Sequence, residues 1–181
     1  MRPVVWMRIG LLVLVGLALL PFLVGFFLPE EFTARIQFNI SKTPEEVWAA
    51  ISEYEKHPVT GAMKKRVTRL PDAGGLPVWV EDMGSSQITV WVTEQTPPTH
   101  QKRHLKDSVV PMTADWTFQI EKVEGGSRVT ATNHTLIRSG TWHVPVFRFI
   151  MTLTKGAEVG LRDYWSGVAR EFGETPVFVS P

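Results

Sequence analysis

A pattern of apolar residues near the end of the chain constrains the fold more than any other feature. Between Pro145 and Phe172 these residues recur every three or four positions, which places them on one side of an α-helix. The set is Val146, Phe149, Ile150, Leu153, Ala157, Leu161, Trp165, Val168 and Phe172. The spacing predicts one continuous amphipathic helix, roughly 40 Å long at about 1.5 Å per residue. Such a helix needs a broad apolar surface to lie on, and only a sheet in the middle of the chain can supply one.

Two glycines interrupt this predicted helix one turn apart. Gly156 and Gly160 each cost about 1 kcal/mol of helix stability relative to alanine, so their presence calls for a reason. One interpretation is that they let the helix approach the sheet closely. The other is that they leave room for a ligand between helix and sheet. The sequence leaves both open.

A second constraint is an uncharged apolar run near the start of the chain. Residues 9–28 contain no charged side chain and are long enough to cross about 30 Å of hydrocarbon. A cleaved signal peptide is the alternative, but its apolar core is usually shorter and ends in small residues. This run ends instead in Gly25-Phe26-Phe27-Leu28. We therefore predict an uncleaved membrane anchor at 9–28.

Charges on either side of the run predict its orientation. Arg2 and Arg8 precede it, and Glu30 and Glu31 follow it. Basic residues tend to stay in the cytoplasm, so residues 1–8 are predicted to be a short cytoplasmic N-terminus. The predicted organisation continues with a globular domain at 30–175 on the far side, periplasmic or at the cell surface, and a C-terminal tail at 176–181.

The clearest strand follows the anchor. From Phe32 to Ile40 apolar and polar residues alternate, which is the signature of a strand with one buried face. Next, Thr43 can cap a helix, Pro44 suits its first position, and Glu46 can complete a capping box. The sequence thus predicts a short helix from Pro44 to about Tyr54 and another turn or two at Val59 to Met63.

The middle of the chain reads as strands separated by turns. Gly125-Gly126 predicts a hairpin between the last two strands. Strands that follow one another through short turns pair antiparallel, so the fold class is α+β with a seven-stranded antiparallel sheet against the C-terminal helix. The predicted strands after the first are Lys65–Leu70, Pro77–Asp82, Gln87–Thr96, Thr99–Leu105, Ala114–Glu124 and Ser127–Ser139.

Composition excludes several functions. The chain has 19 basic residues, of which Arg2 and Arg8 precede the apolar run, and 18 acidic ones, so the domain is close to neutral and we predict no nucleic-acid partner. With no cysteine, the chain has no disulfide, thiolate nucleophile or zinc–cysteine site. His100, His104 and His143 lack a metal-ligand spacing. We predict no metal, no cofactor and no assigned catalytic residue.

The last predicted strand decides which polar groups face the helix. Val129, Ala131, Asn133, Thr135 and Ile137 share one face, and His134 lies on the other. If the apolar set marks the inside, Asn133 and Thr135 point inward and His134 points to solvent. Asn133 is then either a hydrogen-bonding group for a ligand or a core amide satisfied by a neighbour. Trp116 shares an inward face with Phe118. Trp79 and Trp91 fall on the strand face opposite to that of the valines beside them, so either they point outward or the faces there are mixed.

Two stretches of sequence resemble a known superfamily. The segments 38–48, Phe-Asn-Ile-Ser-Lys-Thr-Pro-Glu-Glu-Val-Trp, and 114–121, Ala-Asp-Trp-Thr-Phe-Gln-Ile-Glu, followed by 125–130, are similar to the START-like helix-grip proteins, also called the polyketide cyclase/dehydrase and lipid-transport group (SRPBCC). The resemblance spans about residues 32–173. It implies an apolar pocket between sheet and helix, for which the candidate lining residues are Trp116, Phe118, Asn133, Thr135, Leu153, Gly156, Ala157 and Gly160.

Three functions remain compatible with the sequence. The first is a membrane-tethered module that binds a hydrophobic small molecule, such as a lipid, an isoprenoid quinone or a polyketide-like ring. The second is a cyclase or hydratase that uses Asn133, Glu81 or His143. The third is a structural or assembly protein whose cavity is filled by tryptophans. An enclosed cavity with converging polar groups would distinguish them.

Overall fold

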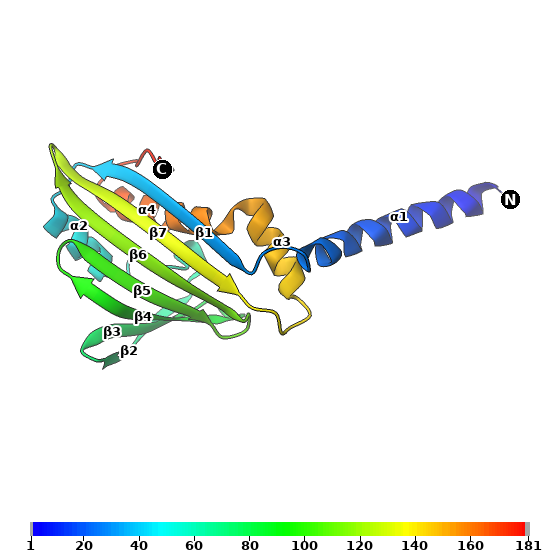
Figure 1. Ribbon diagram of the computed structural model, residues 1–181, viewed down its shortest axis with the longest axis horizontal. Coiled ribbons are helices and arrows are strands. Elements are labelled where there is room, and N and C mark those ends of the chain that lie inside the picture. Colours follow the sequence, from blue (N-terminus) through cyan, green and yellow to red (C-terminus); the bar gives the residue numbers. More distant parts are fainter. Residues whose placement is uncertain (1, 180–181) are drawn as a thin grey trace.

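The centre of the protein is one antiparallel sheet that curves around the C-terminal helices (Figure 1). The computed structural model describes residues 2–179. The strand order is β1-β7-β6-β5-β4-β3-β2, and every neighbouring pair is antiparallel. The strands are β1 (Glu31–Ile40), β2 (Arg66–Ala73), β3 (Leu76–Asp82), β4 (Gln87–Thr96), β5 (His100–Asp107), β6 (Met112–Val123) and β7 (Gly126–Ile137). The predicted seven-stranded α+β fold is confirmed.

Alternation along the strands places apolar residues against the helices, as predicted for β1 and β7. In β7, Asn133 and Thr135 are buried, whereas His134 on the opposite face is exposed. In β3 the faces are mixed: Trp79 is buried, and so is Val78 beside it. The hairpin between β6 and β7 turns at Glu124-Gly125, one residue earlier than the two glycines suggested.

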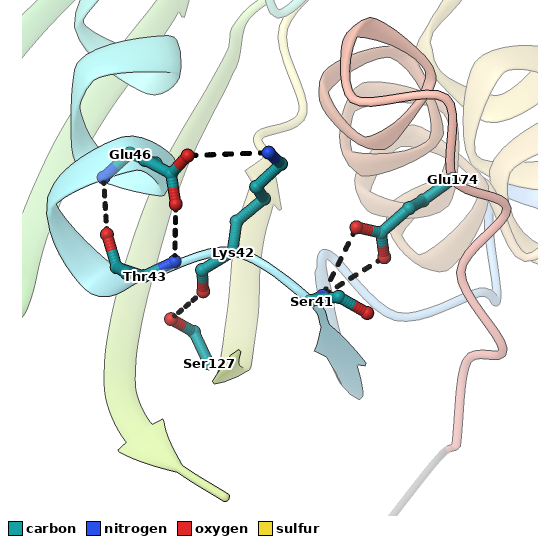
Figure 2. A network of polar contacts seen from close by, with 6 residues as sticks. All are labelled: Ser41, Lys42, Thr43, Glu46, Ser127 and Glu174. Carbon is teal, nitrogen blue, oxygen red and sulfur yellow. Dashed lines mark hydrogen bonds and ion pairs between the residues drawn. The ribbon is translucent and has the colours of Figure 1, made fainter. Parts of the chain in front are cut away.

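The connection after β1 forms the capped helix that the sequence predicted. Helix α2 (Pro44–Ser52) begins at a capping box, in which the Glu46 N–H donates to Thr43 Oγ1 and the Thr43 N–H donates to Glu46 Oε2 (Figure 2). In the same network the Ser41 N–H donates to Glu174, which follows the last helix. These bonds fasten α2 between the sheet and the end of the chain. A short 3₁₀ turn, η1 (Gly61–Met63), follows.

The predicted continuous C-terminal helix is wrong, because the structure has two helices. Helix α3 (Val144–Thr154) ends at Lys155, which adopts a left-handed conformation with φ of 51°, and α4 (Gly156–Glu171) begins directly afterwards. The sequence here is a weak helix former: Thr152 and Thr154 are β-branched, and the Thr154 hydroxyl bonds back to the Ile150 carbonyl. With Gly156 next, the break costs little helix propensity.

The break sends the two helices to different partners. Helix α4 lies on the sheet, with Leu161, Trp165 and Val168 fully buried. Helix α3 instead packs against α1 (Arg2–Gly25), the long helix that projects from the domain (Figure 1). Leu153 is consequently 73% exposed, so the prediction that it lies between helix and sheet is wrong.

The end of the described chain runs along β1. Val179 and Gln37 exchange both backbone hydrogen bonds, at 2.9 and 2.8 Å, and the ring of Phe178 packs against Phe38. The segment predicted as a tail therefore pairs with part of one edge of the sheet, at Gln37 of β1.

Candidate functional site

The space between the sheet and the C-terminal helices divides into two halves. In the packed half, large side chains fill it: Trp79, Arg103, Phe118, Tyr164 and Trp165. In the open half, nearer α1, there is a cavity. Each long inner strand contributes to both halves. Along β6, for example, Met112, Ala114 and Trp116 line the cavity, and Phe118 belongs to the packed half.

Arg103 is the centre of the packed half. It is 1% exposed, and its guanidinium lies 5.1 to 5.4 Å from the ring centroids of Trp79, Phe118 and Tyr164. Its nitrogens donate to Gln101 Oε1, the Tyr164 hydroxyl oxygen and the Ile51 carbonyl, at 2.7, 3.0 and 2.6 Å. Burial raises the pKa of Tyr164 above its ordinary value, so this phenol stays protonated at neutral pH. Aromatic faces and satisfied donors together stabilise the buried cation.

Glu81 is the buried anion of the packed half. Its two carboxylate oxygens accept hydrogen bonds from the Val59 and Thr60 N–H groups, the Thr60 hydroxyl and the Trp79 indole, all between 2.7 and 2.9 Å. Four donors leave this carboxylate little capacity to act on a substrate. We conclude that Glu81 holds the loop before η1 against β3.

The open half contains a cavity of about 600 Å³ that reaches the surface. It lies between η1, the loop after β3, the inner face of β4 to β7, and the junction of α3 with α4. Its lining is Val59, Thr60, Met63, Met83, Ser85, Ser86, Ile88, Leu105, Asp107, Val110, Met112, Ala114, Trp116, Asn133, Thr135, Phe147, Met151, Gly156 and Gly160. The size matches a small-molecule site.

Residue size on α4 explains why this half is open. Gly156 and Gly160 face the cavity, whereas Tyr164, Trp165 and Val168 lie over the packed half. A Cβ at Gly160 would sit 3.8 Å from Trp116, an ordinary contact distance, so a close approach of helix and sheet is not what requires this glycine. A Cβ at Gly156 would meet the Met151 sulfur at 2.5 Å. For Gly160, the interpretation that the glycine leaves room between helix and sheet therefore fits better than close approach of the two.

Asn133 is one of two buried polar residues of the cavity lining that the sequence singled out, the other being Thr135. Its Nδ2 donates to the Ala157 carbonyl at 3.0 Å, and its Oδ1 accepts from the Thr135 hydroxyl at 2.8 Å. An amide has two N–H groups and two lone pairs, so these bonds use two of four positions. Asn133 thus ties β7 to the first turn of α4 and retains capacity toward the cavity. Neighbours therefore satisfy part of this amide, and its role toward a ligand stays a prediction.

The structure brings together part of the predicted pocket set. Trp116, Asn133, Thr135, Gly156 and Gly160 line the cavity. Phe118 lies in the packed half, and Ala157 contributes its carbonyl to Asn133 while its side chain borders a second groove along β1. Leu153 is on the outer surface, because the break at Lys155 turns that part of the helix away from the sheet.

Sequence reasoning missed the methionines. Every methionine after α1 lines the cavity: Met63, Met83, Met112 and Met151. Unbranched and polarisable, methionine adapts to ligands of different shape. The signal was visible in the sequence as four methionines beyond the apolar run, but their convergence depends on the strand register.

Candidate groups for chemistry do not converge on the cavity. His143 precedes α3 and pairs with the Thr141 hydroxyl at 3.2 Å, outside the cavity lining, and Glu81 is enclosed by its donors. Among residues 2–179 no three His, Cys, Asp or Glu side chains are grouped so that they could hold a metal ion. The remaining carboxylate in the lining, Asp107, accepts from the Val109 and Val110 N–H groups through Oδ1.

Comparison with known proteins gives a structural answer only. No known family and no curated protein matches the chain by sequence. Solved structures do match. The ZhuI aromatase/cyclase from Streptomyces sp. R1128 has a TM-score of 0.63 at 12% identity, covering 78% of this chain and 93% of that one.

Two further structures show the same likeness. Ara h 8.0201 has a TM-score of 0.55 at 10% identity over 80% of this chain and 99% of that one. Protein CV1439 from Chromobacterium violaceum has a TM-score of 0.56 at 12% identity over 77% and 95%. The domain therefore has the same fold as these structures, the helix-grip fold that the sequence resemblance predicted. At such identities the likeness defines the architecture, and function must be argued from the site.

Proposed function

We propose that this protein is a membrane-anchored helix-grip domain that binds a hydrophobic small molecule in the open half. The observation that carries the proposal is the cavity itself, about 600 Å³ in volume and lined mainly by methionine, aliphatic and aromatic side chains. Asn133 and Thr135 are polar groups on the sheet wall of the cavity, and the other polar residues of the lining are Thr60, Ser85, Ser86 and Asp107. That composition suits a molecule with an apolar body and one polar end, such as a lipid, a quinone or a polyketide-like ring.

Binding is favoured over catalysis by the groups that the cavity lacks. Glu81 and His143, two of the three residues that a cyclase or hydratase reading would use, are outside its lining. Binding is favoured over a purely structural role because the tryptophans leave the open half unfilled. Solved helix-grip neighbours that are aromatase/cyclases show that the fold can support a reaction, but their likeness reaches the architecture alone.

The anchor is the second part of the proposal. Trp6–Gly25, a stretch of 20 residues within α1, is long and apolar enough to cross a membrane, and its side chains are exposed along nearly all its length. Basic residues before the span and acidic ones after it support an orientation with the domain outside the cytoplasm. A reporter that is active only in the cytoplasm, fused after Pro181, should be silent. A bright fusion would show that the domain lies in the cytoplasm, which is the opposite orientation.

The binding test uses a matched pair of glycine substitutions on α4. Full-length protein is purified in mild detergent, and co-purifying lipids and quinones are identified by mass spectrometry. Gly160→Leu places a side chain in the cavity against Trp116, whereas Gly167→Leu adds the same side chain where nothing lies within 4 Å. We expect Gly160→Leu to lose the bound molecule and Gly167→Leu to keep it.

Two results would count against binding in the open half. One is a wild-type protein that carries no small molecule and shows no saturable tryptophan quenching with a quinone or fatty-acid series. The other is equal retention by both variants, which would place the molecule elsewhere.

A further inference from the structure

Helix α3 has a composition that is unusual for a helix on a protein surface. Its sequence, 144–154, contains one charged residue, Arg148, and that residue is 4% exposed. The outward side carries Ile150 at 48% and Leu153 at 73% exposure, and Trp142 just before the helix is 79% exposed. Water normally faces charged or polar residues on such a helix. An uncharged, exposed, apolar side indicates contact with an apolar partner.

Contacts with α1 fix the level at which α3 lies. A Cβ on Gly25 would fall 1.8 Å from the Pro145 carbonyl oxygen, so the two backbones touch where the span ends. Arg148 donates to Glu30 Oε1 at 2.6 Å and to the Ile137 carbonyl at 2.8 Å. The Ser139 hydroxyl and the Arg148 guanidinium lower the pKa of Glu30, so the ion pair persists at neutral pH. The start of α3 is thus held beside the end of the span.

The length of the span places that level at the membrane surface. Twenty helical residues rise about 30 Å, the thickness of the hydrocarbon layer. Gly25 and the residues beside it then lie at the boundary with the headgroups. Phe26 and Phe27, which directly follow Gly25, are 58% and 91% exposed, and Trp142 lies three residues before Pro145, which contacts Gly25. Aromatic residues are enriched at this boundary.

The cavity lies at the end of the sheet where α1 joins the domain. Pairing of Glu31 with Leu136, Met112 with Ile137, and Ile88 with Asp107 puts these strand ends beside the start of β1, where α1 joins the domain. The cavity is lined from these ends and from the loops that connect them, including Met83, Ser85, Ser86 and Val110. Figure 1 shows α3 between α1 and this end of the sheet.

Helix α3 therefore separates the cavity from the place where the bilayer would be. Phe147 and Met151 line the cavity, and Ile150 and Leu153 lie on an adjoining, exposed side of the helix, the bare side. We propose that the bare side of α3 lies in the acyl–headgroup boundary of the leaflet that α1 leaves, and that the open half exchanges its ligand directly with that leaflet. This inference rests on the proposed anchor and ligand. It adds a contact surface between α3 and the membrane, and a route by which the ligand enters the cavity.

The absence of cysteine allows a direct test of placement, since a single introduced cysteine carries a nitroxide label without background. Full-length Leu153→Cys is compared with Glu124→Cys, which lies in the exposed β6–β7 turn at the opposite end of the sheet. Both are reconstituted in nanodiscs of phosphatidylcholine and phosphatidylglycerol in equal parts. Collision of the nitroxide with oxygen, which concentrates in the bilayer, and with a water-soluble nickel chelate is then measured.

Placement in the bilayer predicts opposite behaviour at the two sites. At position 153 the ratio of oxygen to nickel collisions should exceed that at position 124 severalfold, and Ile150→Cys should agree with Leu153→Cys. Equal ratios at 153 and 124 would overturn the inference. Low collision with both reagents at 153, with dipolar broadening between labels, would assign the bare side to a second copy and also overturn it.

The route is tested by its kinetics. Ile150→Glu combined with Leu153→Glu places two charges on the bare side without touching the cavity lining. Uptake of a pyrene-labelled fatty acid from vesicles of the same lipids should slow severalfold, while affinity for the same probe delivered on cyclodextrin stays unchanged. Unchanged uptake from vesicles would exclude the route. If wild type binds the probe by neither delivery, the proposed ligand function fails, and the nitroxide result still decides where α3 lies.

Discussion

The packed half and the open half are built from the same strands and the same helix, yet one is filled and the other is hollow. Both have inward-facing residues at every second strand position. They differ in what α4 places opposite: Tyr164, Trp165 and Val168 over the packed half, and Gly156 and Gly160 over the open half. Strand alternation therefore decides which residues point inward. The size of the facing helical residues decides whether the space becomes core or cavity.

The two halves also differ in how they treat polar groups. In the packed half Arg103 and Glu81 are fully enclosed, and every partner named above is part of the chain. In the open half the bonds of Asn133 use two of its four hydrogen-bonding positions. A satisfied network rigidifies the packed half, and an incompletely used amide leaves the open half with hydrogen-bonding capacity.

The predictions that follow compare the two halves in a domain lacking residues 1–29. We expect this domain to fold, because it keeps Glu30, whose carbonyl accepts from the Ile137 N–H and whose carboxylate binds Arg148. Its free energy of unfolding is measured by urea titration with circular dichroism.

The largest effect is expected from a charge placed in the packed core. Leu161→Asp buries an unpaired carboxylate at a fully buried position and should cost more than about 4 kcal/mol, enough to unfold the domain. Leu153→Asp is the matched control on α3, and its effect should stay within about 0.5 kcal/mol because the side chain is exposed. Unfolding by both substitutions would mean that α3 packs on the sheet after all.

A truncation in each half gives the next largest difference. Phe118→Ala removes a ring that contacts Tyr164 and Trp165 and should lower the free energy of unfolding by about 3–5 kcal/mol. Met83→Ala, beside the cavity, should cost less than about 1 kcal/mol, because the space next to it is already open. Similar losses in both variants would show that the open half is packed in solution.

Asn133 tests the polar group of the open half. Asn133→Leu leaves the Ala157 carbonyl and the Thr135 hydroxyl without this partner, so stability should fall by about 1–3 kcal/mol. Ligand affinity, measured by tryptophan quenching with a quinone or fatty-acid series, should weaken by a similar free energy. Thr135→Val keeps the tie to Ala157 and should cost about 1 kcal/mol. Loss of stability with unchanged affinity would confine Asn133 to its structural role.

The smallest effect is expected at the far end of the packed half, where Glu171 receives hydrogen bonds from Lys56 and His57. These bonds lower the pKa of Glu171 below its ordinary 4.5. A lowered pKa stabilises the fold above the ordinary value, and this contribution disappears as pH falls through the folded-state pKa. Glu171→Gln should cost about 0.5–1 kcal/mol at neutral pH and flatten the acid side of the stability curve. If Glu171→Gln left the loss of stability at acid pH unchanged, this contact would be excluded as the cause of that loss.

Local sequence signals predicted the fold because the rules behind them act over a few residues. The Thr43–Glu46 capping box, the alternation of β1 and the inward direction of Asn133 all follow from periodicity and short-range hydrogen bonding. The break at Lys155 escaped prediction because the apolar pattern continues across it, and only packing of α3 against α1 shows why the stripe turns outward. Leu153 was misplaced for that reason.

The cavity could be predicted only in part, because its lining comes from residues far apart in the sequence. Asn133 and Thr135 followed from one strand, and Gly156 and Gly160 from one helix. The convergence of Met63, Met83, Met112 and Met151 needs the register of five strands and the position of two loops. Phe118 and Trp116 look equivalent along β6 and both contact Tyr164, yet only Trp116 also lines the cavity.

The segment that runs along β1 bears on how copies of the proposed membrane-tethered domain would associate. An unpaired strand edge is a template on which other chains can add strands. Tethered domains are crowded in two dimensions and share one orientation, so a bare β1 edge would meet its own copies often. The exchange of hydrogen bonds between Gln37 and Val179, with Phe178 seated on Phe38, occupies part of that edge. On the proposed membrane tether, this contact would keep the paired part of β1 from adding a strand of a neighbouring copy.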